Sequence, residues 1–197
     1  EVLNRVIDDL KYAETIASTT KNMGDPALFK GRANKYAIQT LIADMYLWME
    51  KYDDCIHYCD EVIGSGLYRL EEESGWFRIY YPGNSAESIF EIQYSEVYNE
   101  TNPIYDKLLP VSGQRQISFQ PILIELFTPL DIRGASNITW KYLNKGPESS
   151  QRRGEGERDA NFIYYRYADV LLMKAEALAE LGRFNESQEL LNEVIVR

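Results

Sequence analysis

The sequence predicts a mainly α-helical protein in which helical hairpins flank an irregular, partly β insert. Apolar residues recur with helical spacing in residues 1–66 and again in residues 161–197. A hairpin of the first part matches the last hairpin position by position. The stretch 67–160 between them loses the helical period and contains several Pro- and Gly-containing turns. We therefore expect residues 1–197 to be a single domain fragment that consists of these three parts.

The first predicted helix covers residues 3–17, whose apolar side chains share one face: Leu3, Val6, Ile7, Leu10, Ala13 and Ala17. Residues 18–30 are rich in Ser, Thr, Asn, Gly, Asp and Pro, which is typical of a loop. A second helix is expected over residues 33–49. Asp53 is expected to cap a third helix that runs to about Ile63, where a Gly-Ser-Gly tripeptide ends it.

The insert has short β-type runs rather than long helical ones. The runs "SIFEIQYS" at 88–95 and "NITWKYL" at 137–143 predict strands, and "QPILIELF" predicts a short helix. Residues 149–159 carry many charges and two glycines, so we expect a mobile segment there. Helical periodicity returns at about Tyr164 and continues to the end of the chain.

An internal repeat links the two helical parts. When Phe184 is placed on Tyr52, residues 43–63 align with residues 175–195. Each copy has a small residue in its first helix, an aromatic residue in the turn and a small residue in its second helix: Ala43, Tyr52 and Cys55, and Ala175, Phe184 and Ser187. Small residues let antiparallel helices approach closely, as in tetratricopeptide repeats. We therefore predict a tetratricopeptide-like scaffold whose insert lies on the binding face.

Charge and composition exclude several classes of partner. The net charge of −10 argues against nucleic acid, because binding to phosphates needs a basic face. It also disfavours simple adsorption to an anionic membrane. No run of 18 apolar residues exists, so we expect no transmembrane helix. Both ends of the chain fall inside helical patterns and look cut, so targeting signals could have been lost with the missing ends.

The sequence predicts no metal site, no cofactor and no catalytic residues. Cys55 and Cys59 lie one helical turn apart, but His57 points elsewhere and no fourth zinc ligand is apparent. A buried free thiol explains Cys55, because Ser187 occupies the same place in the repeat. His57 is the single histidine, and nothing supports a catalytic triad around it. Most carboxylates fall on solvated helix faces, which disfavours a glycosidase pair.

Arg166 and Asp169 stand three residues apart at the expected start of a helix. The helix dipole favours a carboxylate in the first turns, and the forked donors of Arg166 can bind Asp169 or a loop carbonyl. We expect a structural clamp between the insert and the repeat core rather than a ligand site. Glu87 and Glu91 are expected to share one face of a strand near a sheet edge.

Four ordered motifs resemble one known family. They are "GRANKYAIQTLIADMYLWMEKYDDCIHYCDEVI", "ESIFEIQYS", "PLDIRGA" and "IYYRYADVLLMKAEALAELG". Together, and most specifically through the last, they resemble the SusD/RagB family of nutrient-binding lipoproteins from the outer membrane of Bacteroidetes. The resemblance covers nearly the whole chain. Because family members are longer, the chain looks like the middle-to-late part of such a protein.

The resemblance implies a non-enzymatic protein at the outer surface of the cell outer membrane. It implies binding of an oligosaccharide and its delivery to a SusC-like TonB-dependent transporter. Contact with the membrane would be only through a lipid anchor that is missing from this chain. Two alternatives stay open: a peptide-binding relative of the same family, and a generic tetratricopeptide scaffold for protein partners. A glycan-active enzyme would need a cleft with two carboxylates ~5–9 Å apart.

Aromatic residues with polar tips suit a glycan ligand. The chain has 15 tyrosines and 3 tryptophans against 7 phenylalanines. A sugar ring can stack on an aromatic face, while amides and arginine bind its hydroxyl groups. We therefore predict that the ligand is bound by aromatic and polar side chains of the insert: Tyr98, Tyr105, Trp140, Tyr81, Trp76, Asn102 and Arg115.

Overall fold

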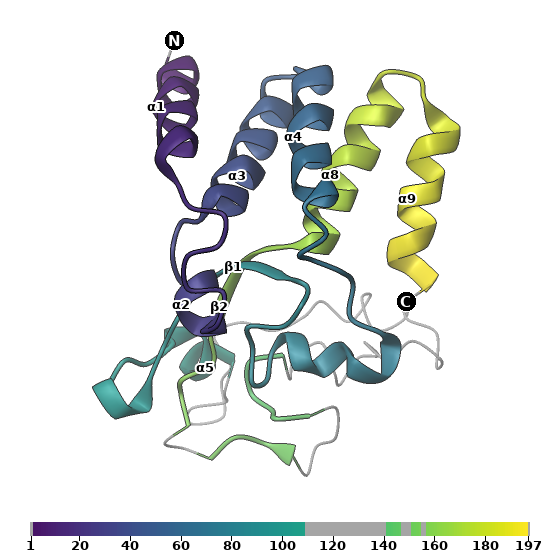
Figure 1. The fold of residues 1–197 in the computed structure, drawn as a ribbon. Helices are drawn as coiled ribbons and strands as arrows, with labels where there is room; N and C mark the ends of the chain where they lie inside the picture. Colours follow the sequence, from purple (N-terminus) through teal and green to yellow (C-terminus); the bar gives the residue numbers. More distant parts are fainter. Residues whose placement is uncertain (1, 109–140, 147–150, 155–156, 197) are drawn as a thin grey trace. The chain divides into compact units, whose positions relative to one another are not determined.

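The computed structural model describes residues 2–108, 141–146, 151–154 and 157–196 (Figure 1). The chain divides into two compact units. The first, here called the helical unit, comprises residues 1–71, 86–91 and 163–197. The second, here called the excursion unit, comprises residues 72–85 and 92–162. Residues 86–91, which belong to the insert predicted from the sequence, are thus part of the helical unit.

Three of the predicted helices are present in the helical unit. Helix α1 spans Val2–Ile16, α3 spans Lys35–Trp48 and α4 spans Tyr52–Gly64. Helix α3 packs against both α1 and α4 (Figure 1). Asn34 starts α3, because its Oδ1 accepts a hydrogen bond from the backbone N–H of Ala37 at 3.0 Å. The spacing of apolar residues therefore located these helices to within about two residues at each end.

Two details at helix starts differ from the expectation. Residues 18–30 are not all loop, because α2 spans Pro26–Lys30. Asp25 caps this helix by accepting a hydrogen bond from the N–H of Leu28 at 3.1 Å, and proline at the first helical position has the required φ. Asp53 does not cap α4. It lies in the first turn, where the helix dipole stabilises its negative charge, and no side chain caps this end of the helix.

A two-stranded sheet pairs segments that are far apart in sequence. Strand β1 spans Ser88–Ile92, within the predicted strand, and pairs with β2, which spans Phe162–Arg166. The N–H of Tyr167 donates to the carbonyl of Glu87 at 2.8 Å. The end of β2 therefore lies beside the start of β1, and the strands are antiparallel. The prediction that helix resumes at about Tyr164 was wrong, because β2 precedes the helix.

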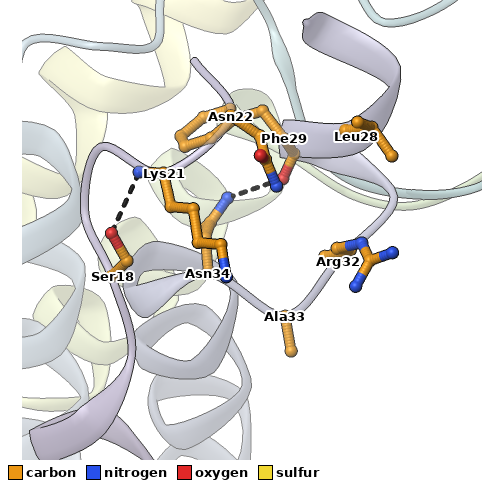
Figure 2. A pocket seen from close by; sticks show the side chains of 8 residues that line it. All are labelled: Ser18, Lys21, Asn22, Leu28, Phe29, Arg32, Ala33 and Asn34. Atoms are coloured by element: carbon orange, nitrogen blue, oxygen red, sulfur yellow. Dashed lines mark hydrogen bonds between the residues drawn. The ribbon is translucent and has the colours of Figure 1, made fainter.

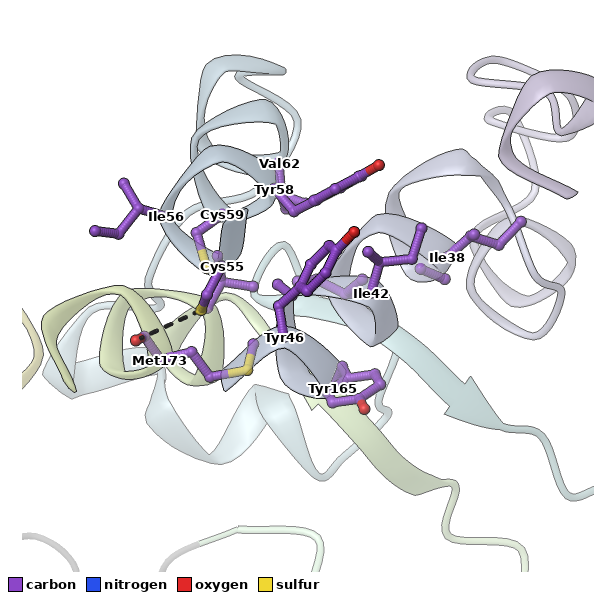
Figure 3. Close-up of a cluster of buried hydrophobic side chains, with 14 of the residues drawn as sticks. Ile38, Ile42, Tyr46, Cys55, Ile56, Tyr58, Cys59, Val62, Tyr165 and Met173 are labelled. Atoms are coloured by element: carbon purple, nitrogen blue, oxygen red, sulfur yellow. Dashed lines mark hydrogen bonds between the residues drawn. The ribbon is translucent and has the colours of Figure 1, made fainter. Parts of the chain in front are cut away.

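The C-terminal hairpin continues the stack of helices. Helix α8 spans Tyr167–Glu180 and α9 spans Phe184–Val196. Helix α8 packs against both α4 and α9, so the two copies of the repeat share one stack (Figure 1). Where α4 meets α8, the Cys55 thiol donates to the carbonyl of Met173 at 3.9 Å (Figure 3). The predicted fold class, tetratricopeptide-like helical hairpins with a partly β insert, is confirmed.

The two alanines that align in the repeat offer a direct test of this packing. Ala43 is completely buried and Ala175 is 1% exposed. Replacing either with Leu is expected to lower the free energy of unfolding by about 2 kcal/mol, because the helices cannot separate to accept the larger side chain. Urea unfolding would measure this, with Ala27→Leu on the exposed side of α2 as the control. Unchanged stability of Ala43→Leu would contradict close packing at this position.

Acidic side chains are buried where the sheet meets α8. Glu87 is completely buried, and its Oε2 accepts a hydrogen bond from the N–H of Glu71 at 3.0 Å. Its Oε1 lies 3.3 Å from the guanidinium of Arg166, which also binds Asp169 at 3.1 Å. Glu91, which lies in β1, is completely buried as well. Arg166 thus connects the residue before β1 with the first turn of α8.

Lys30 is a buried cation in the same unit. It is 7% exposed, and its ammonium lies 5.9 Å from the ring centroid of Tyr68. Burial lowers the pKa of Lys30 to about 8, although the nearby carboxylates of Glu91 and Glu71 oppose this shift. Lys30 therefore fixes α2 to the core at a cost in solvation.

The excursion unit is built from short elements. Two 3₁₀ helices span Glu73–Ile79 and Glu96–Tyr98, and α5 spans Pro103–Leu108. Residues 141–143 form a turn rather than the end of the predicted strand 137–143. The remainder of that strand and the predicted "QPILIELF" helix lie outside the described residues. None of the helices that the structure describes combines the length and the apolar character needed to cross a bilayer.

Candidate functional site

The excursion unit presents an aromatic residue on a tight turn. Ser95 and Glu100 form an antiparallel bridge, with hydrogen bonds of 3.2 and 2.9 Å between their backbones. Asn99 reverses the chain in the left-handed region, with φ of 56°, which asparagine tolerates better than most residues. Val97 and Tyr98 stand at the tip and are 88% and 77% exposed. We call residues 95–100 the Tyr98 turn.

A set of amides follows the end of β1. Asn84 and Gln93 exchange two hydrogen bonds of 3.0 and 2.9 Å between their side chains. Asn161 donates to Gln93 Oε1 at 2.9 Å, and its Oδ1 accepts from the N–H of Tyr94 at 3.2 Å. The side chain of Asn161 therefore fixes the backbone just before the Tyr98 turn. These amides bond one another and position the turn.

Tyr81 is the second exposed aromatic residue among those predicted to bind ligand, at 37% exposure. The guanidinium of Arg153 lies 4.9 Å from its ring centroid, and the ammonium of Lys145 lies 5.9 Å away. Arg153 itself is buried and binds Asp159 at 3.0 Å. Tyr81 is therefore held by cations and only part of its ring is available to a ligand.

Three of the predicted ligand residues are interior residues. Tyr105 is 1% exposed, and its hydroxyl donates to the carbonyls of Arg153 and Gly154. Asn102 is 1% exposed, and its amide donates to the carbonyl of Ala160 at 2.7 Å. Trp76 is 5% exposed. The expectation that these three side chains meet a ligand at the surface is corrected, because all three are engaged inside the excursion unit.

The Trp76 burial has a local cause. Its ring packs edge-to-face on Phe77 and Tyr80, with centroids 5.9 and 5.3 Å away. The spacing of these aromatic residues along a helical segment was a sequence signal for burial. Trp140 and Arg115 lie outside the described residues, so their predicted contact with a ligand stays a prediction. Tyr98 and Tyr81 are the exposed members of the predicted set within the described residues.

Two surface hollows among the described residues of the helical unit were not predicted from the sequence. One has a volume of about 260 Å³ and is shown in Figure 2. We call it the cationic hollow; it is lined by Ser18, Lys21, Asn22, Leu28, Phe29, Arg32, Ala33 and Asn34. Its residues come from the connections on either side of α2 and from α2 itself. Residues 18–30 were predicted to be a loop, and their composition carries no signal for a hollow.

The other hollow surrounds an exposed tryptophan and is called the Trp48 groove. Its volume is about 450 Å³, and it is lined by Asp44, Leu47, Trp48, Glu50, Tyr52, Glu176 and Glu180. Trp48 is 81% exposed. Partial desolvation and the carboxylates of Glu180, Glu50 and Glu176 raise the pKa of the Tyr52 hydroxyl. The groove is thus aromatic and negatively charged.

The structure shows no grouping of metal ligands in its described residues. Cys55 and Cys59 are both buried free thiols. A hydrogen bond with the Cys55 thiol, and then burial, raise the pKa of Cys59 well above its usual value. No three side chains of His, Cys, Asp or Glu gather to hold a metal ion in the part of the chain that is described.

Comparison with known proteins gives the family. The SusD family model matches residues 94–197, more than half of the chain. SusD-like protein P38 of Formosa agariphila is 25% identical over 248 residues, an alignment that covers 98% of this chain and 47% of that protein. The chain therefore spans about half the length of the relative.

Solved structures show the same fold. A SusD superfamily protein from Bacteroides vulgatus ATCC 8482 has a TM-score of 0.76 at 23% identity, covering 98% of this chain and 45% of that one. Surface glycan-binding protein A from Bacteroides uniformis has a TM-score of 0.66 at 19% identity, covering 98% and 48%. The relative and the helical stack are consistent with the family model, whose matched residues include the motif that begins at Arg166. The chain therefore belongs to the SusD family.

Proposed function

We propose that this chain is part of a cell-surface protein that binds an oligosaccharide without catalysis and delivers it to a SusC-like TonB-dependent transporter. In this proposal a lipid anchor holds the full-length protein at the outer surface of the outer membrane. The family membership supports this role, and one similar structure is that of a surface glycan-binding protein. The observation that carries it is the Tyr98 turn, which presents an exposed aromatic ring on a fixed backbone.

The physical basis of glycan binding is stacking on a ring that is already positioned. A tyrosine face covers the apolar face of a sugar, and its hydroxyl reaches the ring substituents. The backbone bridge between Ser95 and Glu100 limits the entropy lost when a ligand binds. A single contact of this kind supports a dissociation constant on the order of millimolar, ~−4 kcal/mol. A polymer with many repeated units strengthens such weak binding through multivalency.

Replacing Tyr98 with Ala is expected to weaken glycan binding by the full-length protein about tenfold, because the stacking surface is lost. A glycan array followed by calorimetry with the best ligand would measure the change. Tyr12→Ala is a matched control, because Tyr12 is 69% exposed on α1, away from the Tyr98 turn in sequence. An equal loss in both variants, or no glycan bound by the wild type, would contradict the proposal.

The Trp48 groove favours a second candidate function, the binding of a basic peptide. Its lining combines an exposed tryptophan with four acidic residues and contains no cation. A Lys or Arg side chain could stack on the ring and pair with the carboxylates. A panel of basic and neutral peptides would test this candidate. This candidate would be favoured over the first proposal if the wild type binds basic peptides, the Trp48→Ala variant does not, and no glycan is bound.

A further inference from the structure

The cationic hollow brings together two basic side chains from separate connections. Lys21 belongs to the connection between α1 and α2, and Arg32 to the connection between α2 and α3. Figure 2 shows their side chains on opposite sides of the hollow, with Phe29 and Leu28 on its apolar side. Phe29 is buried, whereas both basic residues are exposed. The hollow thus has an apolar floor and a charged rim.

The positive charge of this hollow is not compensated by neighbouring acids. No carboxylate is among its lining residues. Neither Lys21 nor Arg32 is in an ion pair with a carboxylate of the described chain, whereas Lys174 of the same unit lies 2.6 Å from Asp60. These two uncompensated cations belong to a chain whose net charge is −10. A positively charged surface attracts anions.

The backbone around the two cations is fixed. The Ser18 hydroxyl accepts hydrogen bonds from the N–H groups of Lys21 at 2.9 Å and Thr20 at 3.2 Å. On the other side, the Asn34 amide donates to the carbonyl of Phe29 at 3.1 Å (Figure 2). Ser18 and Asn34 therefore hold the loops, and Lys21 and Arg32 remain available to a ligand. Asn22, with φ of 66°, adds a third polar side chain to the rim.

We infer that the cationic hollow is an oxyanion-binding site that takes the carboxylate or sulfate group of an acidic sugar. The planar guanidinium of Arg32 can bind two oxygens of such a group, and Lys21 adds a second charge. The apolar side formed by Leu28 and Phe29 suits the ring that carries the group. A neutral sugar would leave both charges unused. The inference rests on the proposed function for the sugar, and it adds an acidic class of ligand.

Paired probes test the charge requirement on the full-length protein. The probes are tetragalacturonate and its methyl ester, a sulfated galactan tetrasaccharide and its desulfated form, and inorganic sulfate alone. The wild type is expected to bind the acidic member of each pair about tenfold or more tightly at low salt, since one charge-assisted hydrogen bond gives such a factor. Added sodium chloride should reduce this preference. Calorimetry would measure each affinity.

Two double variants test whether Lys21 and Arg32 bind the anionic group. In Lys21→Gln/Arg32→Gln the preference for the acidic probes and the binding of inorganic sulfate are expected to disappear. Arg5→Gln/Lys107→Gln removes the same charge from exposed positions elsewhere and should keep both. Equal losses in the two double variants, or a wild type that binds both members of each pair equally, would overturn the inference. Unchanged binding of the neutral probes by the first variant would show that it is folded.

The outcomes for the two proposals can be told apart. Neutral glycan binding that depends on Tyr98, without a preference for acidic probes, would overturn the oxyanion site and leave the proposed function standing. Binding of inorganic sulfate that depends on Lys21 and Arg32, without any glycan binding, would contradict both the glycan function and the acidic sugar as ligand, and would leave only a site for a free anion. Absence of both would overturn both.

Discussion

Replacing Arg166 with Ala is expected to lower the free energy of unfolding of the helical unit by about 3 kcal/mol. Glu87 is completely buried, and Arg166 is its cationic partner at 3.3 Å. Removing the guanidinium leaves that carboxylate in the interior without this charge, although the N–H of Glu71 still donates to it. It also breaks the contact of Arg166 with Asp169 at the start of α8. Urea unfolding followed by circular dichroism would measure the loss.

A surface pair at the start of α9 is the control. Arg183 and Glu186 lie 2.6 Å apart with the same spacing of three residues, but their side chains are 45% and 54% exposed. Arg183→Ala is therefore expected to cost about 0.5 kcal/mol or less. Adding Glu87→Gln to Arg166→Ala should recover part of the loss, because a buried negative charge is removed together with its cationic neighbour. A loss no larger than that of Arg183→Ala would mean that Arg166 is not a structural clamp.

The stability of the protein is expected to rise by up to about 3 kcal/mol between pH 8 and pH 10.5 through Lys30 alone. Burial lowers the pKa of Lys30 to about 8 in the folded state, whereas an unfolded lysine titrates near 10.5. Between these values the unfolded chain binds more protons than the folded one, so raising the pH favours folding. Below pH 8 both states carry the charge and the full cost of burying it remains.

Urea unfolding across this pH range, with Lys30→Met beside the wild type, would isolate the effect. The rise should vanish in Lys30→Met and persist in Lys51→Met, which removes an exposed lysine. Subtracting the two proteins also removes the opposite contribution of Tyr165, whose pKa is raised mainly by burial and by its hydrogen bond to Asp44. Identical slopes for the wild type and Lys30→Met would show that Lys30 is well solvated when folded.

Local periodicity located the helices, but it could not locate the sheet. The apolar spacing that predicted residues 33–49 reflects contacts within a single amphipathic helix, so it survives in the sequence. Strand β2 depends on Ser88–Ile92 for its hydrogen bonds, and no window of sequence around Phe162–Arg166 contains that partner. The apolar and aromatic residues there were therefore read as the beginning of α8. The ion pair of Glu87 with Arg166 was not predicted for a related reason, since the two residues are distant in sequence.

In the candidate site, too, features that depend on local sequence were predicted and features that depend on distant residues were not. Tyr98 was predicted to be exposed from nearby turn residues, and the bridge that exposes it is local. Tyr105 lies near a turn residue too, Pro103, but it is buried, and its hydroxyl donates to the carbonyl groups of Arg153 and Gly154, which are distant in sequence. The Trp48 groove depends on non-local neighbours as well, whereas the cationic hollow is lined by residues 18–34 alone. Trp48 lies on a predicted helix, yet only the packing of α8 beside α3 makes a groove around it.

The antiparallel pairing of β1 and β2 has a consequence for how this family can diversify. The chain leaves the helical unit after Glu91 and re-enters it at Ile163, on two strands that are hydrogen-bonded neighbours. The two ends of the segment 92–162 therefore lie next to each other. Each doubling of the number of residues in this segment costs only about 0.6 kcal/mol of loop-closure entropy. Residues can therefore be inserted between the two strands at little cost in stability while β1 and β2 stay paired.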